Sequence, residues 1–225
     1  MRSSLRDCGL SVAFFAIFAL ALVGQSLAGL AQTNDDLTQH AMAPMSYLDY
    51  VTSSDFVVDV AENWQSEFLQ FFLFIFATVW LVQRGSPESK KPGSQGLGTD
   101  DEQLVGAHAL PDSPAWAKVD GLRRWVYSNS LLIAMGTIFL LSWLAQSLAG
   151  HLVSNEQRAL HGVPPQTWLG YASSAEFWNR TLQNWQSEFL AVGAMVAFSI
   201  YLRQRGSAES KPVGAPHKVS AVESE

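Results

Sequence analysis

Apolar residues along this chain gather in four blocks that polar connectors separate. Residues 8–34 and 125–155 contain no Asp, Glu, Lys or Arg, and each can cross a hydrocarbon core of about 30 Å at about 1.5 Å per residue. The blocks at 68–83 and 189–202 are shorter and cross it only if the amphipathic residues before them enter the interface. We therefore expect an all-α membrane protein with four transmembrane helices, at about 9–31, 63–83, 125–151 and 184–204.

The sequence also contains an internal duplication. The hexapeptide NWQSEF at 63–68 recurs letter for letter at 184–189, and residues 25–90 align with 146–211 at a fixed offset of 121, with 27 identities in 66 positions. Self-similarity of this kind indicates a repeated structural unit. We predict two parallel-repeat helical hairpins, residues 1–84 and 122–205, with a disordered linker at 85–121 and a disordered tail at 206–225. Ser53-Ser54-Asp55 and Ser173-Ser174 stand where the second helix of each hairpin would need an N-cap.

The distribution of basic residues predicts the orientation. Twelve of the fourteen Lys and Arg residues fall before the first span, between Arg84 and Arg124, or from Arg203 onward, which assigns these segments and both termini to the cytoplasm. The two hairpins then have the same orientation, unlike the inverted repeats of many transporters. Residues 2–31 also have the pattern of a secretory signal, but the QSLAG ending at 25–29 recurs at 146–150, which favours a retained helix.

Repeated polar residues near one end of the predicted spans form the candidate site. Glu67 and Glu188 each lie 17 residues above an inner arginine, or about 25 Å, near the outer edge of the hydrocarbon core. A carboxylate at this depth is costly unless it is hydrogen-bonded, hydrated or protonated. The candidate polar cluster comprises Gln25, Asn63, Glu67, Gln146, Asn184 and Glu188, and Trp64 and Trp185 are predicted interface anchors.

Three interpretations of this cluster remain open. The carboxylates pin the hairpins through hydrogen bonds to Gln25 and Gln146, they carry a cation or proton, or they face lipid headgroups. The single Cys8, the scattered histidines and the absence of catalytic motifs predict no catalytic, cofactor-binding or metal residues, so no enzyme. We expect a structural or interaction protein of the envelope, with the lipid bilayer, a homo-oligomer or an envelope protein as partner and no nucleic acid. The alternative is a small cation or proton channel or transporter.

Several motifs together resemble a known family. They are QSLAGH at 146–151, Asn155-Glu156, His161-Gly162, Pro164, NWQSEFL at 184–190 and LRQRGSAESKP at 202–212. This combination resembles a bacterial family of uncharacterised integral membrane proteins classed as a domain of unknown function. The resemblance covers nearly the whole chain and implies a small multi-pass protein of the cytoplasmic (inner) membrane, but no activity or cofactor. The first copy departs from the pattern at Leu30 and in its acidic connector.

Overall fold

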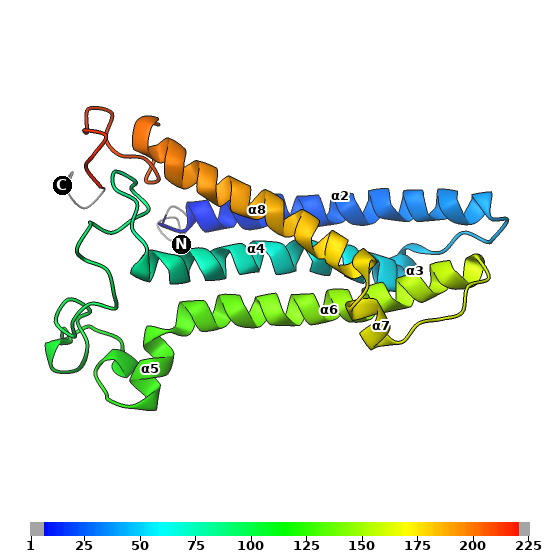
Figure 1. The fold of residues 1–225 in the computed structure, drawn as a ribbon, viewed down its shortest axis with the longest axis horizontal. Coiled ribbons are helices and arrows are strands. Elements are labelled where there is room, and N and C mark those ends of the chain that lie inside the picture. Colours follow the sequence, from blue (N-terminus) through cyan, green and yellow to red (C-terminus); the bar gives the residue numbers. More distant parts are fainter. Residues whose placement is uncertain (1–6, 221–225) are drawn as a thin grey trace. The chain divides into compact units, whose positions relative to one another are not determined.

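The structure, a computed structural model, describes residues 7–220, and every regular element within them is helical. Figure 1 shows the elements in chain order. They are α2 (Gly9–Gln39), α3 (Tyr47–Val51), α4 (Ser54–Trp80), η1 (Gly106–His108), η2 (Ala115–Ala117), α5 (Leu122–Ser128), α6 (Ser130–Leu160), α7 (Trp168–Ala172) and α8 (Ala175–Tyr201). The predicted all-α fold is confirmed. Arg2 and Arg6, which the orientation prediction uses, lie outside the described residues, as does the end of the predicted tail at 221–225.

Two helices in the described part of the chain, α2 and α6, are long and apolar enough to cross a membrane. Each has 31 residues, and only 6% of the most apolar stretch of α2 and 17% of that of α6 is buried. The N-terminal halves of α4 and α8 carry charged residues, among them Asp59, Glu62 and Arg180. Helix length and composition therefore support two candidate spans, where the sequence pattern predicted four.

Serine side chains cap the N-termini of α4 and α8, the helices that follow α3 and α7. The Oγ atom of Ser53 accepts a hydrogen bond from the backbone N–H of Phe56 at 3.3 Å, and Ser174 accepts one from Phe177 at 3.2 Å. These bonds satisfy amide groups that have no partner within the first turn of a helix. Within the two segments predicted to hold an N-cap, Ser53 and Ser174 therefore act as the N-caps.

The same two helices end three residues before the predicted limits of 83 and 204. The backbone N–H of Gln83 donates to Ser89 Oγ at 2.7 Å, and that of Gln204 donates to Ser210 Oγ at 2.9 Å. Because these amides bond to serines further along the chain, they cannot continue the helical ladder. The helices end at Trp80 and Tyr201 for this reason.

The third apolar block forms two helices instead of one. Helix α5 ends at Ser128, and α6 begins at Ser130 after Asn129, which has φ −113° and ψ 9°. The predicted span at 125–151 thus begins inside α5, and α6 continues to Leu160. Helix α2 likewise extends to Gln39, beyond the predicted limit at 31.

The chain divides into two compact units. The first joins the described residues up to Val60 to Ala145–Ala172, and the second joins Ala61–Leu144 to the described residues from Ser173 onward. In the first unit, Val58 at the start of α4 packs with Ala149 and Val153 of α6. The second unit contains most of α4, all of α5 and α8, and the first part of α6.

Glycines in the first unit let two buried tyrosines approach the long helices. A Cβ atom on Gly29 of α2 would overlap the hydroxyl of Tyr50, and one on Gly150 of α6 would overlap the hydroxyl of Tyr171. Tyr50 is 2% exposed and Tyr171 is fully buried. Gly29 and Gly150 are 121 positions apart, as are the two tyrosines; we refer to such positions as counterparts. Close approach therefore explains why the glycine occurs in both copies of QSLAG.

Asparagines hold the connectors of the first unit in the same way in both copies. Asn34 accepts a hydrogen bond from the backbone N–H of Met45 at 2.7 Å and donates to its carbonyl at 3.2 Å. Its counterpart Asn155 accepts from Gln166 at 2.8 Å and donates to the carbonyl of Gln166 at 3.0 Å. The side-chain amide of each asparagine thus bonds both the N–H and the carbonyl of one connector residue, as the backbone of a neighbouring β-strand would.

Between α4 and α5, residues 85–121 form turns, bends and the two short 3₁₀ helices η1 and η2. Residues 206–220 after α8 consist of turns and irregular backbone. The disorder of this linker and of the tail stays a prediction.

Candidate polar site on helices α4 and α8

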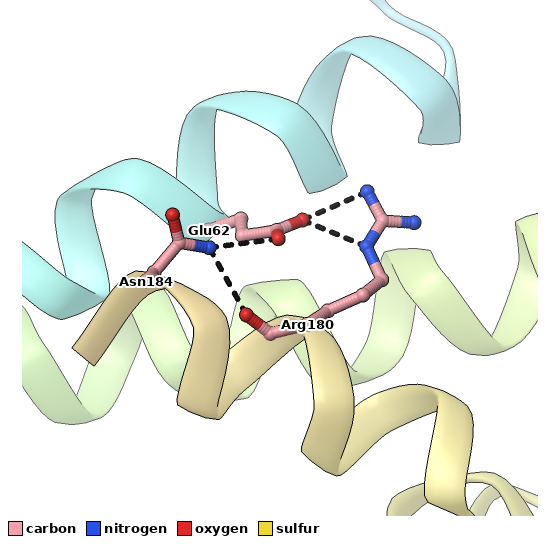
Figure 2. Close-up of polar contacts among 3 residues, drawn as sticks. All are labelled: Glu62, Arg180 and Asn184. Carbon is pink, nitrogen blue, oxygen red and sulfur yellow. Dashed lines mark hydrogen bonds and ion pairs between the residues drawn. The ribbon is translucent and has the colours of Figure 1, made fainter. Parts of the chain in front are cut away.

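A carboxylate of α4 and two polar side chains of α8 meet in the second unit, as Figure 2 shows. Glu62 Oε2 accepts hydrogen bonds from Arg180 Nη2 at 2.7 Å and Nε at 2.9 Å, and Oε1 accepts one from Asn184 Nδ2 at 2.8 Å. Asn184 Nδ2 also donates to the backbone carbonyl of Arg180 at 3.1 Å, one turn earlier on α8. The three side chains therefore connect two helices that are far apart in the sequence.

Both charged groups of this ion pair are shielded from solvent. The Glu62 side chain is 14% exposed and that of Arg180 is 33% exposed. An ion pair in such surroundings is less screened than a surface pair, and the hydrogen bonds from Asn184 and Arg180 offset the desolvation of the carboxylate. Loss of one partner would leave the other charge partly buried and unbalanced.

A second polar contact joins α4 to α8 next to this ion pair. The indole Nε1 of Trp185 donates to Gln65 Oε1 at 2.7 Å, and Gln65 is fully buried. The ring of Trp185 lies 5.9 Å from that of Trp143 on α6, which stacks on Phe177 at 6.2 Å. Trp178 contacts the same ring edge-on at 5.9 Å. Aromatic rings of α6 and α8 therefore cover the apolar side of the polar contacts.

The structure brings some of the predicted cluster together. Glu67 on α4 is exposed and Glu188 on α8 is half-buried, and the charge of Glu67 acts on Glu188. Asn184 belongs to the ion-pair site, whereas its counterpart Asn63 is exposed on α4. The charges of the two repeated carboxylates thus influence each other.

Gln25 and Gln146 belong to the first unit, so their predicted pairing with the carboxylates of the second unit stays a prediction. Gln25 is half-buried on α2. Gln146 on α6 is fully buried, and within residues 7–220 neither of its side-chain polar atoms has a hydrogen-bond partner. Of the predicted anchors, Trp64 is 39% exposed, while the indole N–H of Trp185 is taken by Gln65.

Sequence reasoning missed Glu62, Arg180 and Gln65. Glu62 and Arg180 each occur in one copy of the repeat, so a search for repeated polar positions does not find them. The available signal was that Arg180 lies four residues before Asn184, on the same helical face, and that Glu62 adjoins the hexapeptide. Gln65 lies in the first hexapeptide and its counterpart Gln186 in the second, but an uncharged side chain gives no signal of a contact between helices.

Beyond the C-terminal ends of α4 and α8, the chain forms two loops with matching hydrogen bonds. We define them as the first motif loop, residues 83–90, and the second motif loop, residues 204–211. In the first, Glu88 N–H donates to Ser86 Oγ at 3.2 Å; in the second, Glu209 N–H donates to Ser207 Oγ at 3.2 Å. Both loops contain a glycine with positive φ, Gly85 at 88° and Gly206 at 81°. The identities in this part of the sequence thus specify one loop conformation used twice.

Carboxyl groups of the two motif loops contact each other. Burial, a side-chain hydrogen bond to Glu209 and the charge of Glu209 together raise the pKa of Glu88 above its usual range. Two carboxyl groups share a hydrogen bond only when one of them is protonated. The contact is therefore strongest when Glu88 carries a proton.

Comparison with known proteins identifies the family. The chain matches the model of a family described as a domain of unknown function (DUF6766) over residues 1–222, and it belongs to that family. No curated protein and no solved structure matches it. The predicted resemblance to a domain of unknown function is confirmed in this respect.

Proposed function

We propose that the chain is a four-span protein of the bacterial cytoplasmic membrane that acts as a structural or interaction protein and not as an enzyme. The observation that carries the proposal is the exposure of α6. This helix is internal in the chain, yet only 17% of its most apolar stretch is buried, whereas the core helix of a soluble protein would be largely covered. Lipid is the solvent that suits such a surface.

Exposed apolar side chains extend this argument to the other two long helices. On α4, Phe71 and Phe76 are each 49% exposed, and on α8, Leu190 is 73% and Phe198 is 60% exposed. Each helix has 27 residues, which corresponds to about 40 Å and exceeds a hydrocarbon core of about 30 Å. The charged N-terminal turns then lie at the outer headgroups, where Trp64 and Trp178 suit the interface.

Contacts between counterparts support two hairpins of the same orientation. Glu67 is near Glu188, and Glu88 bonds Glu209, 21 residues further along the chain in both copies. Counterparts meet at two separate levels only if a pseudo-twofold axis runs along the helices between α4 and α8. An axis in the membrane plane would bring counterparts together at one level at most. This arrangement supports two hairpins that cross the membrane in the same direction, and the distribution of basic residues supports a cytoplasmic location of both termini.

The polar site supports a structural role in this arrangement. Glu62 is neutralised and hydrogen-bonded by Arg180 and Asn184, so the site joins the helices and leaves no open charge to guide an ion. The partners in this proposal are the lipid bilayer and either a second copy of the chain or an envelope protein, and not nucleic acid.

One observation favours the alternative, a cation or proton pathway. The repeated carboxylates Glu67 and Glu188 come from different helices and lie close enough to influence each other. Such a pair could bind a proton or cation near the membrane surface.

Proton and cation flux through the protein in liposomes distinguishes the two functions. A structural protein gives no flux above that of empty vesicles, with or without the substitutions Glu67→Gln and Glu188→Gln. Flux that the wild-type protein supports and that either Gln variant abolishes would contradict the structural role and establish conduction. Arg180→Lys, which keeps a positive charge beside Glu62, is the matched control for loss of folding.

A further inference from the structure

Two basic side chains in and beside the second motif loop bond backbone carbonyl groups. Lys211 of the second loop is 2% exposed, and its ammonium donates to the carbonyls of Pro216, His217 and Val219 at 3.3, 3.1 and 2.9 Å. Arg203 donates to the carbonyls of Ser199, Ile200 and Leu202 at the end of α8. These two cations therefore serve the fold of the C-terminal segment and are not available to a ligand.

Arg205 has no such role. Among residues 7–220, no side chain or carbonyl bonds the guanidinium of Arg205 or of its counterpart Arg84, and both arginines are exposed. The arginine is nevertheless present in both copies of a loop whose other identical residues have contacts that fold the loop. Both guanidinium groups are therefore available to a partner outside the chain, and the surroundings of each arginine decide whether one binds.

A pocket opens beside Arg205 in the second motif loop. It has a volume of about 490 Å³ and is lined by Arg205, Gly206, Ser207, Ser210, Lys211 and Val213, among others. Ser207 Oγ accepts the N–H of Glu209, and no described residue accepts a hydrogen bond from its hydroxyl. The guanidinium and this hydroxyl are donors of the kind that phosphate oxygens accept.

The corresponding position in the first loop is closed. Ser86, the counterpart of Ser207, is fully buried, and its Oγ lies 3.3 Å from Ser199 Oγ. Gly85 beside it has no room either, because a Cβ atom there would overlap the carbonyl oxygen of His217. Arg84 therefore stands next to a loop whose hydroxyl is occupied, and it provides an internal comparison for Arg205.

An apolar groove continues from the pocket along α8. It has a volume of about 230 Å³ and shares Ser207 and Ser210 with the first pocket. Its apolar lining consists of Met195, Phe198 and Leu202, and Ser199, Arg203, Gln204 and Glu209 complete it. The three apolar side chains are 43%, 60% and 63% exposed. A polar pocket that continues into an apolar groove at the end of a membrane helix matches the headgroup and acyl chain of a phospholipid.

We propose that the second motif loop binds the phosphate of an anionic phospholipid of the inner leaflet through Arg205 and Ser207, with an acyl chain along Met195, Phe198 and Leu202. The inference rests on the proposed membrane location. It assigns one lipid site to the second hairpin and none to the first.

Native mass spectrometry of the full chain, purified in detergent micelles doped with phosphatidylglycerol, tests the site. Arg205→Gln weakens phosphatidylglycerol binding by about tenfold or more, whereas Arg84→Gln, which removes the same charge, changes it by about twofold or less. Ser207→Ala gives an intermediate loss. Phosphatidylcholine, whose headgroup has no net charge, binds more weakly than phosphatidylglycerol to the wild-type protein.

Two results would overturn the proposal. Equal losses in Arg205→Gln and Arg84→Gln would show that only net charge matters. Displacement of the lipid by inorganic phosphate at similar concentration would show that the loop binds a soluble phosphate instead. Extraction of cell membranes with alkaline carbonate is scored in parallel for every variant. Release of the wild-type protein by carbonate would contradict the proposed membrane location. If only the lipid-site proposal is wrong, the protein stays in the membrane fraction.

Discussion

Glu62 and Arg180 form their ion pair between positions that are not counterparts. The counterpart of Glu62 is Gln183, and that of Arg180 is Asp59. The duplicated helices α4 and α8 have thus acquired opposite charges at one place, where the side chains bond at 2.7 Å. A difference between the copies, and not their similarity, makes the connection specific.

Substitutions at this ion pair affect stability to different extents. Arg180→Gln leaves the Glu62 carboxylate with only Asn184, and we expect a loss of about 1–3 kcal/mol in the free energy of unfolding. Glu62→Gln keeps an acceptor for Asn184 and costs less. Gln183→Ala, at the exposed counterpart of Glu62, changes stability by about 0.5 kcal/mol at most. Unfolding in detergent measures these values, and equal losses for Arg180→Gln and Gln183→Ala would contradict the role of the pair.

The carboxyl contact between the motif loops predicts a dependence on pH. Because the pKa of Glu88 is raised in the folded protein, its protonated form stabilises the fold, and this stability is lost as the pH rises through the raised pKa. The melting temperature in detergent should therefore fall as the pH rises from the ordinary pKa of a glutamate through the raised pKa of Glu88. Glu88→Gln should flatten this dependence, whereas Asp112→Asn, at an exposed linker position, should not. A wild-type slope retained in Glu88→Gln would show that other groups cause it.

Individual residues show how far repetition can guide sequence reasoning. Glu67 and Glu188 were selected because they recur at equivalent depth, and in the second unit the charge of Glu67 acts on Glu188. Glu62 and Arg180 could not be selected in this way because each occurs in one copy. An ion pair between two helices depends on the crossing of the helices, which a residue pattern along one chain does not encode.

At the scale of elements, the first QSLAG motif and its second copy act as packing sites. The glycine in each admits a tyrosine, and the serine contacts an aromatic side chain: Ser26 Oγ lies 2.9 Å from the Tyr47 hydroxyl, and Trp168 Nε1 donates to Ser147 Oγ at 3.2 Å. The short helices α3 and α7 therefore dock on α2 and α6 through equivalent residues. Within the first unit these contacts give each copy the same local structure.

This docking predicts different effects for two glycines of the long helices. Gly150→Ala places a methyl group against the fully buried Tyr171, so we expect a loss of about 1–3 kcal/mol. Gly193→Ala on α8 meets nothing within 4 Å and should leave stability unchanged or raise it by about 1 kcal/mol at most. Gly29→Ala, at the counterpart of Gly150, should resemble Gly150→Ala. Equal stabilities for the variants at Gly150 and Gly193, measured by unfolding in detergent, would refute the packing role.

For α4 and α8, the sequence predicted the start of the helix better than its end. Ser53 and Ser174 cap helices through the next few amides, and such local bonds are visible in sequence. The ends of α4 and α8 depend on bonds from Gln83 and Gln204 to serines six residues later. Apolar residues continue to Leu81 and Leu202, so hydropathy alone extends both helices too far.

Two features characterise the molecule as a whole. Its long apolar helices are largely exposed, and several of its hydrogen bonds recur between residues 121 positions further along the chain. The duplication was read from identities, and the matching bonds of Asn34 and Asn155 agree with it. The number of spans was harder to predict because α4 and α8 combine charged N-terminal turns with apolar remainders. Length and composition make α2 and α6 candidate spans, and whether α4 and α8 also cross a membrane requires a topological measurement.

Cysteine accessibility in intact bacterial cells tests the four-span account most directly. In a Cys8→Ser background, single cysteines replace Met42 and Val163 in the predicted outer connectors, and Ser94 and Val213 in the predicted inner segments. With four spans, an impermeant thiol reagent labels positions 42 and 163 in intact cells and labels positions 94 and 213 only after permeabilisation. With α2 and α6 as the only spans, position 94 would be labelled from outside and position 163 protected. That pattern would contradict the account.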